Sequence, residues 1–153
     1  MRRKADPVSR GHHRKIGADL FNYTWSLLDK KRRTTEESDL MLHAAHASRY
    51  HWGQAGTALN ISVGEWQIAR VYATLGRAEP AEYHARRSLE IARRGRLSPF
   101  YVAYAYEALA RAAAVAARAR EKSRYLREAR RIAARVRDRD DRRMLLEDLG
   151  TVP

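Results

Sequence analysis

Acidic and histidine side chains recur at helical spacing between residues 36 and 51, and these are the residues of the sequence that could do chemistry. Asp39, His43 and His46 stand at i, i+4 and i+7, so a helix would carry all three on one face. One carboxylate and two imidazoles in this arrangement could ligate zinc or a non-haem metal. The remaining ligands would have to come from other parts of the chain, where the candidate donors are Glu65, His84 and Glu107.

The same histidines also have a structural interpretation, which we favour. On this interpretation His43 and His46 are interior or half-buried side chains that hydrogen-bond to Glu65 or to a tyrosine. The sequence has no paired Glu-x-x-His motifs, no glycine-rich phosphate loop, no G-x-S-x-G motif and no nucleophile with an obvious base. We therefore expect no catalysis, cofactor or metal. A metal-dependent hydrolase built on histidine and glutamate is kept as an alternative.

The composition of the 153-residue chain limits the fold and the setting of the protein. This length suits a single domain with its own hydrophobic core. The chain contains no cysteine, which excludes disulfides and thiolate sites and is compatible with a reducing cytoplasm. No apolar stretch reaches the roughly 18 residues of a membrane span. We therefore expect a cytoplasmic protein that does not bind membranes.

Apolar residues recur with helical periodicity along the chain, and no segment alternates like a β-strand, so an all-α fold is expected. Two capping boxes, Thr34 with Glu37 and Ser62 with Glu65, predict where two helices begin. The turn near residues 117–122 contains neither Gly nor Pro and is placed by length alone. The segments expected to be helical are 16–31, 35–52, 62–76, 79–94, 99–117, 122–136 and 142–150.

An internal repeat predicts how these helices are arranged. The tripeptide Ile-Ala-Arg at 68–70 matches Leu-Ala-Arg at 109–111, at an offset of 41 residues. Ala-Arg-Arg at 85–87 recurs at 129–131, at an offset of 44 residues. The sequence therefore predicts two helical hairpins in tandem, of which the second has a slightly longer turn.

Residues 62–95 resemble a tetratricopeptide repeat (TPR), with weaker similarity over 98–136. The pattern rests on Ala69, Tyr72, Leu75 and Gly76 in the first helix and on Ala81, Ala85 and Ser88 in the second. The strings HAAHASRYHW and GEWQIARVYATLGRAEPA also resemble a group of small uncharacterised bacterial helical proteins. The TPR resemblance implies a stack of about three antiparallel helix pairs plus a C-terminal capping helix. It also implies a groove, lined by the first helix of each pair, that binds a peptide or protein segment.

In such a groove, Trp66 and Arg70 would lie beside Glu107 and Arg111. The repeat places the two arginines at equivalent positions, where they could bind a carboxylate or phosphate next to the flat indole of Trp66. We therefore expect a non-enzymatic interaction module that binds an acidic or carboxylate-ended protein or peptide. The alternative is that Glu107 pairs with Arg70, or with Arg111 four residues away. A stack of only three pairs could also form a homodimer.

The net charge of +13 lies mostly toward the two ends of the chain. Residues 1–33 carry 10 basic and 3 acidic side chains and residues 86–153 carry 18 and 9, whereas residues 34–85 carry 3 and 6. We expect a basic flexible arm over residues 1–14, followed by a single TPR-like domain over 15–150. This arm and an arginine-rich sixth helix could attract RNA, including ribosomal RNA, or another polyanion. Interleaved glutamates favour a solvated surface instead. The candidate nucleic-acid contacts are Arg2, Arg3, Lys4, Arg10, Arg14, Lys15, Arg120, Arg124, Arg127, Arg131 and Arg135.

Overall fold

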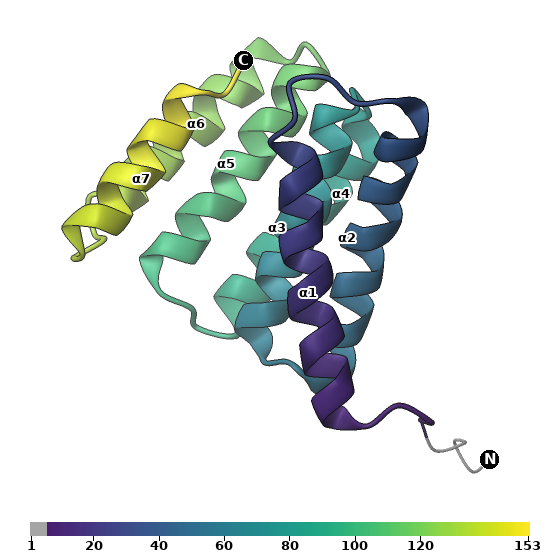
Figure 1. The fold of residues 1–153 in the computed structure, drawn as a ribbon. Helices are drawn as coiled ribbons and strands as arrows, with labels where there is room; N and C mark the ends of the chain where they lie inside the picture. Colours follow the sequence, from purple (N-terminus) through teal and green to yellow (C-terminus); the bar gives the residue numbers. More distant parts are fainter. Residues whose placement is uncertain (1–5) are drawn as a thin grey trace.

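The computed structural model describes residues 6–153, and this part of the chain forms seven α-helices and no β-strand (Figure 1). Consecutive helices are joined by short connections and pack in the pairs α1–α2, α3–α4 and α5–α6. α2 also contacts α3, α4 contacts α5, and α7 packs against both α5 and α6. The expected all-α stack of three helix pairs with a C-terminal helix at its end is confirmed. The helices are α1 (Arg10–Leu28), α2 (Thr35–Ala55), α3 (Ala58–Thr74), α4 (Ala78–Arg94), α5 (Pro99–Val115), α6 (Ala119–Ala133) and α7 (Arg139–Gly150).

Side-chain caps define the first residues of several helices, among them α2 and α7. The predicted capping box of α2 is confirmed, because the Glu37 N–H donates to Thr34 Oγ1 at 3.1 Å and the Thr34 N–H donates to Glu37 Oε2 at 3.0 Å. At α7, Asp138 Oδ1 accepts from the backbone N–H groups of Asp140 and Asp141, each at 2.9 Å. These bonds satisfy N–H groups that have no partner within the helix.

The predicted start of a helix at Ser62 is wrong. α3 begins at Ala58, where the Thr57 N–H donates to Asn60 Oδ1 at 3.0 Å. Ser62 is buried in the second turn, and its hydroxyl donates to the backbone carbonyl of Ser88 on α4 at 3.0 Å. The Ser-x-x-Glu pattern therefore marks a close contact between two helices and not a helix end.

The first helix begins at Arg10, within the segment 1–14 that we expected to be flexible. Ser9 Oγ accepts from the His12 N–H at 3.2 Å and caps the helix. His13 follows and is buried, with 2% of its surface exposed. The burial of His13 against α2 explains why residues 10–14 are ordered, since an isolated first turn would have little to stabilise it. Residues 1–5 of the expected arm lie outside the described residues.

The turn between α5 and α6 is tighter than expected and spans residues 116–118. Ala117 adopts a left-handed conformation with φ 56°. The Ala117 N–H donates to the Ala114 carbonyl at 3.0 Å, and the Arg118 N–H donates to the Ala113 carbonyl at 2.9 Å. Glycine usually occupies this position of a helix end, so an alanine there left the turn without a sequence marker. α6 also ends at Ala133, three residues before the predicted end of that helix.

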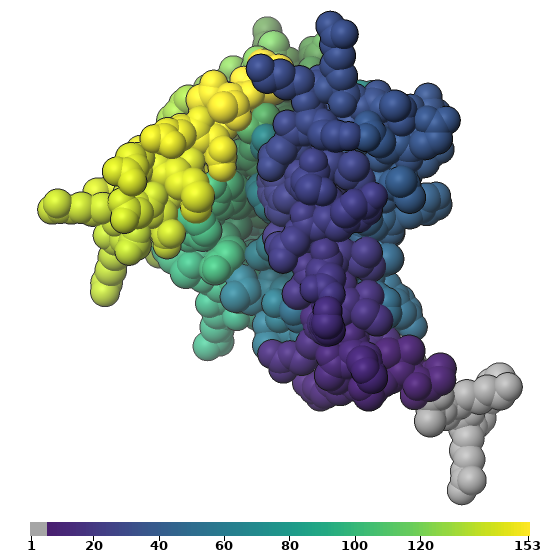
Figure 2. All heavy atoms as spheres, viewed as in Figure 1, coloured from purple at the N-terminus to yellow at the C-terminus, as the bar shows by residue number. Residues whose placement is uncertain are grey.

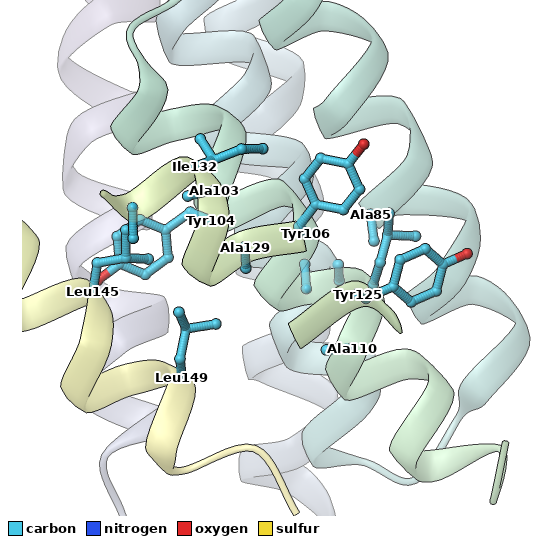
Figure 3. Close-up of a cluster of buried hydrophobic side chains, with 14 of the residues drawn as sticks. Ala85, Ala103, Tyr104, Tyr106, Ala110, Tyr125, Ala129, Ile132, Leu145 and Leu149 are labelled. Atoms are coloured by element: carbon cyan, nitrogen blue, oxygen red, sulfur yellow. The ribbon is translucent and has the colours of Figure 1, made fainter. Parts of the chain in front are cut away.

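Small residues bring the helices of the second and third pairs close together. In Figure 3, Ala85, Ala103, Ala110 and Ala129 lie among the larger side chains of the main buried cluster, and these four alanines are fully buried. Leu145 and Leu149 of α7 complete this cluster against α5 and α6. Alanine permits close approach of helix backbones, so α4, α5 and α6 pack closely at these residues. No helix of residues 6–153 is both long and apolar enough to cross a membrane.

Candidate functional site

A cleft of about 460 Å³ lies between α1, α3, α5 and α7. α3 and α5, which touch each other, form its floor, while α1 and α7 stand on either side (Figures 1 and 2). Its apolar lining is mainly aromatic, and the aromatic residues lie on α1, α3 and α5. The five aromatic residues are Trp25, Trp66, Phe100, Tyr101 and Tyr104.

These aromatic side chains form a connected wall. The ring centroids of Trp25 and Trp66 are 5.5 Å apart, those of Trp66 and Tyr104 are 5.3 Å apart, and those of Tyr104 and Phe100 are 4.9 Å apart. Such pairs are stabilising beyond their buried area and hold the rings in fixed positions. The cleft therefore presents a preformed apolar surface across three helices.

Glu107 connects the polar groups beneath this wall. Its side chain is fully buried, and its carboxylate accepts hydrogen bonds from Trp66 Nε1 and from the Arg70 guanidinium, each at 3.1 Å. Arg111 Nε donates to the same carboxylate from the following turn of α5. From the sequence, we considered two alternatives, in which Glu107 pairs with Arg70 or with Arg111. The structure contains both ion pairs.

Arg111 is buried and does not line the cleft, which corrects the sequence prediction that it lines the groove. Only 7% of Arg111 is exposed. Its remaining nitrogens donate to the Asp148 carbonyl at 3.1 Å and to the Thr151 hydroxyl and carbonyl at 2.5 and 3.3 Å. Arg111 therefore fastens the C-terminal end of α7 to α5. The repeat pattern could not foresee this role because α7 has no counterpart in the first hairpin.

Arg70 is the only basic residue that lines the cleft in the described part of the chain. Its side chain is 23% exposed and lines the cleft. Apart from the bond to Glu107, its guanidinium N–H groups have no hydrogen-bond acceptor among residues 6–153. Burial and the nearby Arg111 charge lower the pKa of Arg70, while Glu107 opposes this shift. Arginine stays protonated in proteins, so Arg70 offers several charged donors beside the indole of Trp66.

Two carboxylates lie at the sides of the cleft. Asp29 directly follows α1, and Asp148 of α7 accepts a hydrogen bond of 2.6 Å from the Tyr104 hydroxyl. Burial, together with this bond to Asp148, raises the pKa of Tyr104, so its hydroxyl remains protonated as a donor. The cleft thus combines a positive centre at Arg70 with negative charges at its margins.

Three residues of the predicted metal set come together between α2, α3 and α4, namely His46, Glu65 and His84. Their polar atoms bind protein groups. Glu65 is 5% exposed, and its two carboxylate oxygens accept from His84 Nδ1 at 2.6 Å and from Arg49 Nε at 2.9 Å. His46 Nε2 lies 3.0 Å from the Tyr72 hydroxyl. The prediction that His46 hydrogen-bonds to a tyrosine is confirmed.

Asp39 and His43 do not join this network. Both side chains are exposed on α2, and no hydrogen bond or ion pair within the described chain connects them to His46, Glu65 or His84. Among residues 6–153, no group of three or more His, Asp or Glu side chains converges as a metal site. Helical spacing placed Asp39, His43 and His46 in one row. Of these three residues, only His46 is covered by α3 and α4. The expectation of an interior His43 is therefore wrong.

A second histidine contact links α1 to α2 and was missed from the sequence. His13 Nδ1 lies 2.7 Å from His51 Nδ1, and His13 Nε2 lies 3.1 Å from Asp6 Oδ2. Burial lowers the pKa of His51, and the nearby His13 adds to this effect. These residues are 38 positions apart, and no local pattern pairs them, so only the packing of the first two helices reveals the contact.

The basic residues proposed for nucleic-acid binding fall into separate groups. Arg2, Arg3 and Lys4 lie outside the described residues. Arg10, Arg14 and Lys15 are exposed on α1, so this part of the expected arm is helical. Arg120 is exposed at the start of α6. The remaining four line hollows beside α6 and are Arg124, Arg127, Arg131 and Arg135.

Comparison with known proteins adds no further constraint on function. No protein-family model matches the chain, and no curated protein is significantly similar to it. The function is therefore argued from the geometry of the aromatic cleft and of the charged surfaces around it.

Proposed function

We propose that this protein is a non-enzymatic, TPR-like interaction module whose aromatic cleft binds a carboxylate-ended segment of a partner protein. The observation that carries the proposal is the position of Arg70, whose free guanidinium N–H groups open into the cleft beside Trp66. A guanidinium group binds a carboxylate through paired hydrogen bonds, and these bonds gain strength where water is partly excluded. The arrangement of α1, α3 and α5 along one side of the stack supports the TPR-like interpretation.

The lining of the cleft narrows the chemistry of the partner. The aromatic wall suits an apolar or aromatic side chain, which would bury its surface against Trp25, Trp66 and Phe100. Asp29 and Asp148 would repel a strongly acidic segment. A segment that is apolar apart from one carboxylate, such as the C-terminus of a protein chain, satisfies both conditions. The proposed partner is therefore more narrowly defined than the acidic or carboxylate-ended partner expected from the sequence.

The network of Glu65, His84 and Arg49 does not support the alternative of a metal-dependent hydrolase. Both oxygens of Glu65 already accept hydrogen bonds from protein groups, and neither Glu65 nor His84 lines the aromatic cleft or the hollows beside α6. A hydrolytic site needs a substrate cavity next to its acid and base groups. We therefore do not propose this activity.

Selection from a library of peptides with free C-termini tests the proposal. We expect the wild-type protein to enrich peptides that end in an apolar residue, and to bind their amidated forms at least about tenfold more weakly, because the carboxylate forms a charged hydrogen bond with Arg70. Arg70→Gln should show the same loss for the free peptides. Binding is followed by the fluorescence of the cleft tryptophans.

Arg49→Gln is the matched control for this experiment. Arg49 is 22% exposed in its side chain and pairs with the buried Glu65, as Arg70 is 23% exposed and pairs with the buried Glu107. Arg49 lies outside the cleft, so its substitution should leave peptide affinity within about threefold of wild type. The proposal fails if no free C-terminus is enriched, or if amidated and free peptides bind equally well.

A further inference from the structure

A second groove lies between α4 and α6 and differs from the aromatic cleft in its charge. It has a volume of about 540 Å³ and is lined by five arginines and one glutamate, together with Leu89, Tyr106, Leu109 and Tyr125. A neighbouring hollow of about 280 Å³ shares three of these charged residues and adds Arg135. We call the two hollows together the arginine groove. Its arginines are Arg86 and Arg93 from α4, Arg124, Arg127 and Arg131 from α6, and Arg135 just after α6.

The positive charge of the arginine groove is only partly compensated by the protein. Arg131 pairs with Glu128, and Arg86 pairs with Glu82. The other four arginines, among them Arg93, have no carboxylate within 4.0 Å in the described part of the chain. Like charges held close together without counter-charges create a positive potential that attracts anions. The interleaved glutamates that favoured a simple solvated surface from the sequence thus neutralise only part of this face.

Two tyrosines hold the guanidinium groups in place. Arg86 and Arg124 both donate to the Tyr125 hydroxyl at 3.4 Å, so these two cations converge on one oxygen atom. Arg93 donates to the Tyr106 hydroxyl at 2.5 Å and also lies over its ring, 5.6 Å from the centroid. In Figure 3 the hydroxyls of Tyr106 and Tyr125 point away from the buried cluster. Since the tyrosine rings are buried, they position the arginines in advance of binding.

We infer that the arginine groove binds the phosphodiester backbone of a nucleic acid. The three arginines of α6 from Arg124 to Arg131 extend over about 10 Å at the rise of a helix, and Arg135 continues the row just after the helix, so the row exceeds the reach of a single phosphate group. A guanidinium fork matches phosphate geometry, and a nucleic acid supplies one negative charge at every nucleotide along such a row. An acidic peptide would need a long unbroken run of carboxylates to match this density.

The groove offers backbone contacts without an evident means of reading bases. Tyr106 and Tyr125 are 9% and 7% exposed, so their rings are not free to stack on nucleobases. Contacts to phosphate fix the position of a nucleic acid but carry no sequence information. We therefore expect binding that depends strongly on salt and little on sequence. This inference is independent of the proposed carboxylate site, which lies in a separate cleft that shares no lining residue with the groove.

Fluorescence anisotropy with a labelled oligouridylate of about 12 nucleotides tests the inference. The wild-type affinity should fall by about 50-fold between about 50 and 200 mM salt, as expected for four phosphate contacts to a single strand. Replacing Arg124, Arg127 and Arg135 by Gln should weaken binding by about 100-fold at low salt and reduce the slope of log affinity against log salt by about 2. These side chains are exposed and have no ion-pair partner in the described chain, so the variant should fold normally.

The control replaces Lys31, Arg32 and Arg77 by Gln, which changes the net charge equally at exposed residues between helices. It should bind oligouridylate within about threefold of wild type, because none of the three residues lines the arginine groove. An equal loss in both variants would show a general charge effect and overturn the assignment to the groove. Equal affinity for an oligoglutamate peptide of the same length would overturn the assignment to nucleic acid.

Discussion

The Arg70 guanidinium lies 3.1 Å from Glu107 Oε1, and this ion pair joins α3 to α5 at the floor of the aromatic cleft. The same carboxylate also holds the Trp66 indole and Arg111. Arg111 in turn bonds to the end of α7. One buried glutamate therefore fixes both the aromatic floor of the cleft and, through Arg111, the helix that forms one of its sides.

Replacing Glu107 by Gln should destabilise the protein strongly. Glutamine keeps the shape of the side chain but removes the charge that compensates two arginines, so we expect a loss of about 3–5 kcal/mol in the free energy of unfolding. Glu90→Gln is the control, since Glu90 pairs with exposed arginines on the surface of α4 and should change stability by less than about 0.5 kcal/mol. Urea unfolding followed by circular dichroism measures both values. A Glu107→Gln protein as stable as the Glu90→Gln protein would contradict the role assigned to this carboxylate.

Replacing Arg111 by Lys should loosen α7 while leaving the first two helix pairs unchanged. Lysine keeps the charge near Glu107 but has a single nitrogen, which cannot occupy the separate positions from which Arg111 Nε, Nη1 and Nη2 donate to Glu107, Thr151 and Asp148. We expect amide hydrogen exchange in residues 139–150 to become at least about tenfold faster, because each lost bond lowers the local opening free energy by about 1 kcal/mol or more. Exchange in α1 and α2 serves as the internal control. A uniform acceleration across all helices would argue against a local tether.

Stability should decline as the pH falls below neutrality, and His46 should account for part of that decline. Burial, together with the charges of His84 and His43, lowers the pKa of His46 below its ordinary value of 6.5, against the opposing charge of Glu65. A histidine with a lowered pKa in the folded state favours the fold above its unfolded pKa. This contribution is lost as the pH falls through the folded pKa. Thermal unfolding between about pH 7.5 and 5.5 measures the effect.

His46→Gln should show a smaller loss of melting temperature over this pH range than wild type, because glutamine does not titrate and can still bond to Tyr72. His43→Gln, on the same helix but exposed, should follow the wild-type curve. If the two variants have the same pH dependence, the titration of His46 does not contribute.

At lower pH, protonation of Glu65 should also reduce the stability of the fold. Burial favours its neutral form, but the hydrogen bond from His84 and the Arg49 charge outweigh burial and lower its pKa.

The local signals of the sequence predicted the helices better than the site. Periodicity indicated all seven helices, and the capping box at Thr34 identified the start of α2 correctly. The apparent capping box at Ser62 was misleading because the same residue types serve a contact between α3 and α4. Ala117 shows the converse case, in which a left-handed turn occurs without a glycine to mark it.

The candidate site was predicted in part. The internal repeat correctly brought Trp66, Arg70, Glu107 and Arg111 together, because equivalent positions of tandem hairpins fall on the same side of a stack. It could not show which of these residues remains accessible. The accessibility of these residues depends on α7, which lies outside the repeat and accepts a hydrogen bond from Arg111.

The sequence by itself determined that this chain forms helices, where most of them lie, and that two of the hairpins repeat, because these properties depend on local periodicity and spacing. Only the tertiary structure decided how each charged group is used. Glu107 is shared by two arginines, His46 pairs with a tyrosine, and the arginines of α6 meet Arg86 and Arg93 of α4. Partners of this kind come from distant segments, and their selection depends on which faces the packing buries together, which no local pattern encodes.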